Sequence, residues 1–535
     1  MSTKKSKFNK DDSLPNLPSE IIDCILKHIK DQNTLFSCLL VNRLWCRKVV
    51  PVLWASPKPL FNSSYVNNGS NRNDGVDKVE GDISGIGEDS VHNNNNFNLL
   101  NLSNPLFEYA AFLKELDYNV LRTAVRKSYK NIGGKEFSRK IKPLKPDLNP
   151  TRQMTVMKAL IKLFTRCSVL DSVKFNSLHD DIPNFFLFVE GQHSLSNVSK
   201  LHVSSSSDLP NTLALLNRLS LLCSNIRHLI IDSTDLTTSE NLADIIRAQQ
   251  NLISLELHGN FINVSPVFLS LETHISTLTS IKFVDIDYQW KLLEILSKCI
   301  NLKSLEVISN INNLNDEDQD SEKELNFVLP PTICNLKSLK LINQKSIYSS
   351  LIFQTSGGSV KKLSLNTINK RVVDSILKFC SGVNDLSLDI SNTPHHDFSQ
   401  HLRLLKGLRL INLKFTSDTA NDMDLLLPEI THILPKSLLN LDLEKEFTLE
   451  PLGNFINLCK TPIKELTVFP NAPIDSDYIS TIINYSKKNS SFKKLHLNLS
   501  WESSLINDRY TKGIIKDPID ELFTIDLEKL RDHVV

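Results

Sequence analysis

Residues 252–262 read Leu-Ile-Ser-Leu-Glu-Leu-His-Gly-Asn-Phe-Ile, and this stretch decides the expected fold. Apolar residues occupy positions 252, 255 and 257, and the last two alternate with polar residues, as in a strand with one buried face. The same spacing, apolar-x-x-apolar-x-apolar, recurs at steps of 23 to 34 residues. Its thirteen copies begin at Leu170, Val198, Ile226, Leu252, Leu278, Leu302, Leu336, Val360, Val383, Leu408, Leu438, Ile463 and Phe492.

Stretches between the copies carry apolar residues at helical spacing, as in residues 239–250, 288–300 and 478–486. A strand, a turn and a helix that recur with this period indicate a solenoid, because one such unit cannot cover its own apolar face. The alternative is an ordinary α/β domain whose strands share a Leu-x-Leu habit. Strands of such domains are usually longer apolar runs, which favours the solenoid.

The repeated pattern resembles the leucine-rich-repeat family, and residues 252–262 match its motif most closely. Cysteines near the leading apolar residue suit its cysteine-containing subtype; they are Cys223, Cys299, Cys334 and Cys380. The resemblance implies an α/β solenoid, or horseshoe, over residues 166–510, with a C-terminal cap or tail at 511–535. Polar residues at or near the place of Asn260 are expected to bond between turns; they are Thr234, Asn310, Ser391 and Thr416. Ile286 and Ile368 are expected to interrupt this polar ladder.

Residues 14–61 form a separate apolar stretch in which three short helices are expected. Pro18 suits the first position of a helix, because the missing N–H costs nothing there. Thr34 is the expected N-cap of the second helix, and the third carries Trp45 and Trp54. Three helices in about 40 residues form a poor core. A partner is therefore expected to cover part of their apolar surface.

This stretch resembles an F-box, through Leu-Pro-x-Glu-Ile at 17–21, Val-Asn-Arg-Leu-Trp at 41–45 and Leu-Trp at 53–54. The resemblance implies docking onto the Skp-type adaptor of an SCF ubiquitin ligase, and through it onto a cullin and a RING subunit. The implied adaptor contacts are Leu17, Pro18, Glu20, Ile21, Ile25, Leu40, Val41, Asn42, Trp45 and Trp54. Some of these must pack inside the module, and spacing alone does not sort them. The alternative is a generic helical cap on the solenoid.

Together the two resemblances imply a substrate-recognition subunit of a ubiquitin ligase, with no covalent chemistry on this chain. The protein client would lie on strand residues that point away from the core. The candidates are Glu256, His258, Glu306, Asp385, Asp389, Asp442, Glu444, Glu465 and Phe469. From Asp385 onward they lean acidic, which suggests a basic or mixed peptide, although ordinary solvated strand residues are the alternative. An F-box scaffold that does not promote degradation and a plain repeat interaction protein also stay open.

Composition limits the remaining function classes. The 535 residues contain 61 Lys and Arg against 60 Asp and Glu, a formal net charge of +1. Such a balance argues against a main role in binding nucleic acid or an anionic membrane, because both require a positively charged surface. Nine cysteines include no Cys-x-x-Cys spacing, and no segment approaches a membrane span. We expect no cofactor, no metal and no membrane partner, and a cytoplasmic or nuclear location.

Several further stretches are interpreted without a ligand. Residues 62–98, rich in Asn, Gly, Ser and Asp, are expected to form a disordered insert, and residues 99–165 a helical connector. The aspartates at 316, 318 and 320 have the spacing of the first three ligands of a calcium-binding loop. The later positions of such a loop require Gly and Glu, and other residues stand there. His395, His396, Asp397 and His401 are interpreted as a surface loop. The basic run over residues 122–145 is interpreted as a solvated helix and linker.

Overall fold

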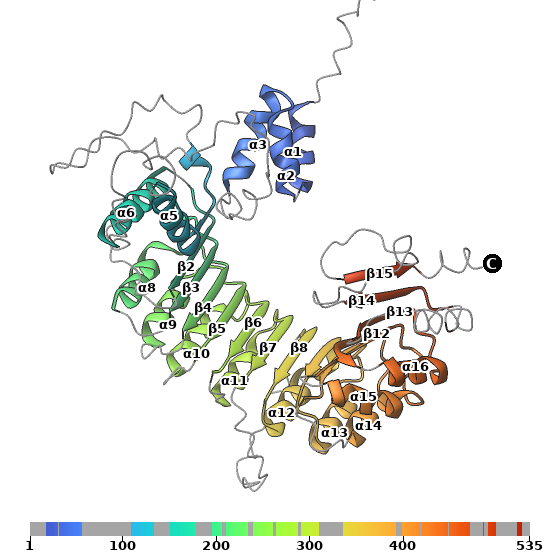
Figure 1. Ribbon diagram of the computed structural model, residues 1–535. Coiled ribbons are helices and arrows are strands. Elements are labelled where there is room, and N and C mark those ends of the chain that lie inside the picture. The colour runs from blue at the N-terminus through green and yellow to red at the C-terminus, as the bar shows by residue number, and fades with distance from the viewer. Residues whose placement is uncertain are drawn as a thin grey trace, which may run out of the picture. The chain divides into compact units, whose positions relative to one another are not determined.

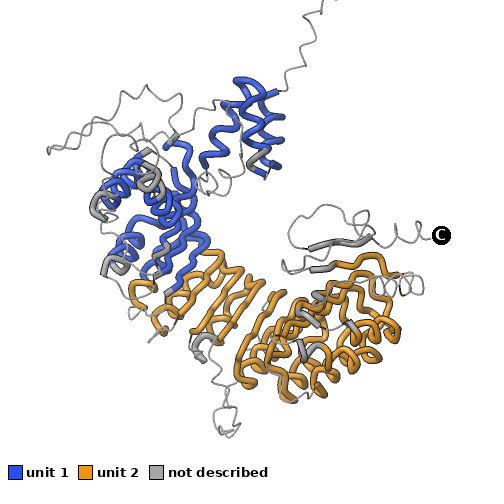
Figure 2. Tube along the Cα trace, viewed as in Figure 1, with its two compact units in different colours: residues 1–233, 244–251 blue, residues 234–243, 252–535 orange. Residues whose placement is uncertain are grey.

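The computed structural model forms two compact units, which Figure 2 colours separately. Unit 1 comprises residues 1–233 and 244–251, and unit 2 comprises residues 234–243 and 252–535. The structure describes residues 18–29, 31–55, 109–132, 150–167, 169–177, 195–205, 210–233, 239–259, 264–286, 290–309, 335–391, 398–417, 420–447, 449–470, 485, 491–498 and 522–526. The expected insert at 62–98 and the aspartates at 316–320 lie outside these residues.

Unit 1 begins with three helices, α1 (Ser19–His28), α2 (Gln32–Leu39) and α3 (Arg43–Ala55) (Figure 1). Pro18 stands just before α1 in an extended conformation, so it is not the first helical residue as expected. The expected N-cap of α2 is also wrong. Asp31 caps this helix, because its carboxylate accepts hydrogen bonds from the Thr34 N–H at 2.8 Å and the Thr34 hydroxyl at 2.6 Å.

The strands of unit 1 are parallel and pair in chain order. They are β1 (Glu115–Asp117), β2 (Ser172–Ser177), β3 (Lys200–Ser205) and β4 (His228–Ser233). The other elements are the 3-10 helix η2 (Tyr109–Phe112) and the helices α5 (Tyr118–Ile132), α6 (Pro150–Cys167) and α8 (Pro210–Leu222). Strand β1 lies in the stretch for which only helices were expected. Its neighbourhood repeats the strand pattern at Leu113, Leu116 and Tyr118, all buried.

In unit 2, strands β5 to β14 are also parallel and pair in chain order, and β15 pairs antiparallel with β14. The strands are β5 (Ser254–His258), β6 (Ser280–Val284), β7 (Ser304–Ile308), β8 (Ser338–Ile342), β9 (Lys362–Leu365), β10 (Asp385–Asp389), β11 (Asn412–Thr416), β12 (Asn440–Phe447), β13 (Glu465–Pro470), β14 (Lys494–Asn498) and β15 (Leu522–Asp526). This ladder of parallel strands is the α/β repeat that the spacing predicts.

Helices cover one face of the unit 2 strands (Figure 1). They are α10 (Ser265–Leu271), α11 (Trp290–Lys298), α12 (Ser346–Ser356), α13 (Lys370–Phe379), α14 (Ser399–Gly407), α15 (Ala420–Ile430) and α16 (Leu449–Leu458), with the 3-10 helices η4 (Glu272–His274) and η6 (Gly357–Ser359). Helix α9 (Ser239–Arg247) spans the division between the units in the sequence. The strand face that the helices leave uncovered is called the open face below.

Strand alternation builds the core. In β5, Leu255 and Leu257 are fully buried, whereas Ser254, Glu256 and His258 between and beside them are partly exposed. The equivalent residues of neighbouring turns stack on Leu255 and Leu257. Each Å² of apolar surface that is buried in this way stabilises the fold by about 25 cal/mol. In the described residues no helix is long and apolar enough to cross a membrane.

A strand begins at twelve of the thirteen predicted copies in the expected register. The copy expected from Leu408 is displaced by two residues, because β11 buries Leu410, Leu413 and Phe415 and leaves Ile411 exposed. A shift of two residues keeps the same side chains on the same face of a strand. The run of leucines before β11 therefore fits both registers, and the register predicted from the sequence pattern is the wrong one.

Backbone hydrogen bonds fix the stacking of the turns. The carbonyl oxygen of Ile253, which precedes β5, accepts the N–H groups of Thr279 at 2.9 Å and Ser280 at 3.2 Å in the next turn. The residue before the strand does the same in each later turn up to Lys464, which accepts from Lys493 and Lys494. One carbonyl of each turn thus accepts two backbone N–H groups of the next turn. These N–H groups at the start of each strand therefore have a hydrogen-bond partner.

The turns that follow the strands use left-handed residues and an asparagine pair. Gly259, Asp285 and Asn343 have φ of 124°, 58° and 52°. The side chain of Asn366 accepts from the Asn343 N–H at 2.7 Å and donates to the Asn343 side chain, which in turn donates to the Ser309 carbonyl at 2.6 Å. The expected ladder residues Thr234, Asn260 and Asn310 lie outside the described residues.

Candidate protein-interaction surfaces

The three N-terminal helices close around a small core, whose members are Ile22, Leu26, Leu35, Val49 and Leu53. Trp45 and Trp54 are partly buried against it. An ion pair between Lys48 Nζ and Asp23 Oδ2, 2.8 Å apart, joins α3 to α1 at the surface. Five buried aliphatic side chains are few for an independent fold.

A large share of the apolar side chains in this module faces outward. Leu40 is 88% exposed and Val41 58%, in the turn between α2 and α3, and Ile21 is 46% exposed on α1. The remaining exposed apolar residues of the module are Ile25, Phe36, Leu44 and Val52. Contiguous exposed apolar surface in a soluble protein marks an interaction site. The turn from α2 to α3 and the outer face of α1 are the candidates here.

The structure sorts the ten residues of the expected adaptor contact. Seven are exposed: Pro18, Glu20, Ile21, Ile25, Leu40, Val41 and Asn42. Trp45 and Trp54 pack against the module core instead, and Leu17 lies outside the described residues. Asn42 also caps α3, because its side-chain oxygen accepts the N–H groups of Leu44 at 2.9 Å and Trp45 at 3.0 Å.

Sequence reasoning missed three exposed apolar residues of the module, Phe36, Leu44 and Val52. They lie on helices that also carry core residues, such as Leu35 beside Phe36 and Leu53 beside Val52. Apolar residues on both sides of a short helix are themselves a signal, because a helix that packs on one face needs only one apolar stripe.

The module is joined to the first strand turn of unit 1. The carbonyl oxygen of Ala55, the last residue of α3, accepts the Lys114 N–H at 3.0 Å. The carbonyl oxygen of Lys114 then accepts the N–H groups of Asp171 and Ser172. The residues before β2 and β3 each accept two N–H groups of the next turn in the same way. The end of α3 thus takes the place of a preceding turn, although residues 56–108 separate Ala55 from Tyr109 in the sequence. This contact caps the strand ladder of unit 1.

On the open face of unit 2, the expected client residues Glu256 and His258 are bound to each other. Glu256 Oε1 accepts from His258 Nε2 at 2.6 Å and pairs with Lys282. Partial burial raises the pKa of Glu256, but the hydrogen bonds from Lys282 and His258 outweigh it and leave the pKa below its ordinary value. Glu306 stands beside Lys282 in the strand register. The charges alternate along this row.

The acidic residues near the C-terminal strands are also balanced by lysines. Lys414 Nζ lies 2.6 Å from Glu444 and 3.6 Å from Asp442, and Lys494 Nζ lies 2.9 Å from Glu465. Burial raises the pKa of Asp442, and Lys414 opposes that shift only in part. The acidic face expected from the sequence is therefore neutralised only in part, because two lysines stand against three carboxylates here.

Two acidic client candidates differ from the rest. Asp385 and Asp389 on β10 form no ion pair within the described residues, and Asp389 instead accepts hydrogen bonds from Ser391. Phe469 belongs to β13 in its backbone, but its side chain lies outside the described part of the chain. The other candidates are seven acidic residues and His258, and lysines of neighbouring strands pair with Glu256, Glu444 and Glu465.

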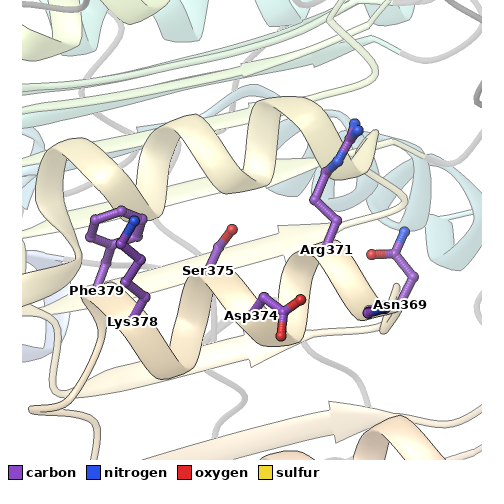
Figure 3. Close-up of a pocket in the computed structure, with 7 residues that line it drawn as sticks. Asn369, Arg371, Asp374, Ser375, Lys378 and Phe379 are labelled. Carbon is purple, nitrogen blue, oxygen red and sulfur yellow. The ribbon is translucent and has the colours of Figure 1, made fainter.

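A shallow groove of about 580 Å³ runs along the solvent side of α13. Figure 3 shows its lining: Asn369, Lys370, Arg371, Asp374, Ser375, Lys378 and Phe379. Asp374 is held by Arg403 of α14 at 2.6 Å, and Lys378 Nζ lies 4.9 Å from the centre of the Phe379 ring. All lining residues come from one helix and its cap, so the groove lacks the convergent walls of a small-molecule site.

The described residues hold no group of three or more side chains suited to a metal ion. The interpretation of His401 as part of a surface loop is wrong. It lies on α14, is 3% exposed, and meets the Phe398 ring at 5.9 Å between ring centres. Phe398 and Leu404 are buried beside it in the apolar pattern of that helix, which the neighbouring histidines at 395 and 396 obscured in the sequence.

Comparisons with known proteins add little. No protein-family model matches the sequence, and no curated protein matches it. One solved structure that matches is the crystal structure of the Rad7 and Elc1 complex in yeast, with 14% sequence identity and a TM-score of 0.33. The match covers 74% of this chain and 94% of the other. At this level of similarity it supports no inference about partners or function.

Proposed function

We propose that this protein is the substrate-recognition subunit of an SCF-type ubiquitin ligase. In this role the N-terminal module binds a Skp-type adaptor, and the open face of the repeat binds a protein client. The observation that carries the proposal is the apolar surface of Ile21, Leu40 and Val41, which stands where the F-box resemblance puts the adaptor contact. Nothing within the described residues covers these side chains, and a folded partner would bury them favourably.

The mechanism is proximity. An adaptor on the module and a client on the repeat would share one chain, so client lysines would be held at high effective concentration near the conjugating enzyme. The bond from Ala55 to Lys114 supports this arrangement, because it ties the module directly to the first strand turn of unit 1. No residue of this chain needs to take part in covalent chemistry.

Two other functions remain as alternatives. An F-box scaffold would bind the adaptor without promoting degradation, and a plain repeat interaction protein would not bind it. Neither alternative explains a specific observation better than the ligase role does. A plain repeat interaction protein would not account for the exposure of Leu40 and Val41.

The adaptor contact is tested on the full-length protein with a purified Skp-type adaptor. Leu40→Lys combined with Val41→Lys should abolish capture, because both side chains are exposed and the charges would have to be buried on binding. The matched control is Leu221→Lys on α8, since Leu221 is 77% exposed. Equal capture by both variants would exclude this surface as the adaptor site.

A reconstituted ubiquitylation assay then separates a receptor from a scaffold. Proteins captured by the full-length chain are incubated with adaptor, cullin, RING subunit and conjugating enzyme. A receptor should give ubiquitin transfer to a captured protein that the double lysine variant loses. Adaptor binding without any transfer would favour the scaffold.

A further inference from the structure

Four lysines form a row at the edge of unit 2 where the strands begin. Lys303, Lys337 and Lys361 directly precede β7, β8 and β9, and Lys362 opens β9. All four are exposed. Their backbones are neighbours, because the Lys337 N–H donates to the Lys303 carbonyl at 2.8 Å and the Lys361 N–H donates to the Lys337 carbonyl at 2.9 Å. These residues are called the lysine row.

We propose that the lysine row binds an acidic polypeptide segment of a partner protein. Successive turns stack about 4.8 Å apart, so the row concentrates positive charge on adjacent strands. Like charges directly opposite each other on neighbouring strands are destabilising. The fold does not require them, since the equivalent positions in flanking turns hold the uncharged Thr279 and Asn384. A partner that supplies carboxylates would relieve this repulsion.

The lysine row differs from several lysines of unit 2 that are paired with carboxylates. On the open face, Lys282, Lys414 and Lys494 each pair with a glutamate. Within the described residues, no ion pair involves Lys303, Lys337, Lys361 or Lys362. Lys362 stands opposite Asp385 in the strand register, so the positive field of the row comes mainly from Lys303, Lys337 and Lys361, on a chain whose formal net charge is only +1.

Helix α13 extends the positive surface to the same edge. It ends at Phe379, and β10 begins at Asp385, so the end of the helix lies toward the edge where the strands start. Lys378 in its last turn is exposed. The groove of Figure 3 leads along the helix to this residue, past Arg371. Asp374 within the groove is already held by Arg403.

An acidic polypeptide fits this surface better than nucleic acid does. Binding of single strands relies on aromatic side chains on which bases stack. The edge positions of the flanking turns carry Thr279 and Asn384, and the ring of Phe379 lies under Lys378. Carboxylates need only the lysine charges, and side-chain ammonium groups adapt to a flexible chain. The inference is independent of adaptor binding by the N-terminal module.

The test measures binding of a fluorescent oligo-glutamate peptide to the full-length protein by anisotropy. Lys337→Glu combined with Lys361→Glu should weaken binding roughly tenfold or more. The matched control reverses Lys464 and Lys493, which directly precede β13 and β14 and are linked by the same backbone bond at 2.8 Å. Both variants change the net charge equally, and the control should stay within about twofold of the unaltered protein.

A second double variant, which removes the two charges without reversing them, controls for misfolding of the charge-reversal variant. Lys337→Gln combined with Lys361→Gln should give an intermediate loss, and added salt should weaken binding to the unaltered protein. Equal loss in the control, or no loss in the charge reversal, would overturn the proposal. Tighter binding of a single-stranded oligonucleotide of equal charge than of the peptide would also overturn it. Adaptor capture should be unchanged in every lysine variant.

Discussion

Truncation of Leu40 should weaken adaptor binding and leave the fold intact. The side chain is 88% exposed in the free protein, so Leu40→Ala removes no internal packing. If the adaptor buries it, the lost methine and two methyl groups are worth about 0.8 kcal/mol each, or ~2 kcal/mol in total. That corresponds to about a thirtyfold rise in Kd. Isothermal titration calorimetry with the purified adaptor measures the change directly.

Leu26→Ala is the comparison that separates binding from folding. Leu26 is 2% exposed in the module core, so its truncation should lower the free energy of unfolding of the module by about 2–5 kcal/mol. Thermal unfolding followed by circular dichroism should detect this loss for Leu26→Ala and none for Leu40→Ala. An unchanged Kd for Leu40→Ala, or a loss of stability equal to that of Leu26→Ala, would refute the reasoning.

Three further predictions concern the repeat and the thiols. Asn366→Ala leaves the Asn343 N–H without its acceptor and should lower the free energy of unfolding by about 1–3 kcal/mol in urea denaturation. The folded pKa of Glu256 lies below its ordinary value, so its stabilisation is complete above that value and is lost as the pH falls through the folded pKa. Glu256→Gln should therefore flatten the acid side of a stability profile, and an unchanged profile would contradict this. Burial raises the pKa of Cys223 to about 12, so mass spectrometry should find maleimide on the exposed Cys24 well before Cys223.

Repetition made most of the fold predictable. Each copy alone is ambiguous, but a fixed spacing repeated along the chain leaves few other ways to bury the apolar residues. Strand β1 was missed because its third apolar position holds Tyr118 and the surrounding stretch has a helical pattern. Strand β15 was missed because it pairs antiparallel with β14 and lies outside the repeated pattern.

The surfaces were less predictable than the core, because charge compensation depends on which residues meet across strands. The acidic lean from Asp385 onward is visible in the sequence, but its partial compensation by Lys414 and Lys494 follows from the strand register. The lysine row has the same origin, since Lys303 and Lys337 are far apart in the chain and adjacent in the ladder. In the module, spacing could not tell the exposed Leu40 from the partly buried Trp45.

Hydrogen exchange of the full-length protein with and without the Skp-type adaptor tests the central claim most directly. The account predicts new protection in α1 and in the turn around Leu40 and Val41, with unchanged exchange in strands β5 to β14. Protection confined to the repeat strands, or no protection anywhere in α1 to α3, would contradict it.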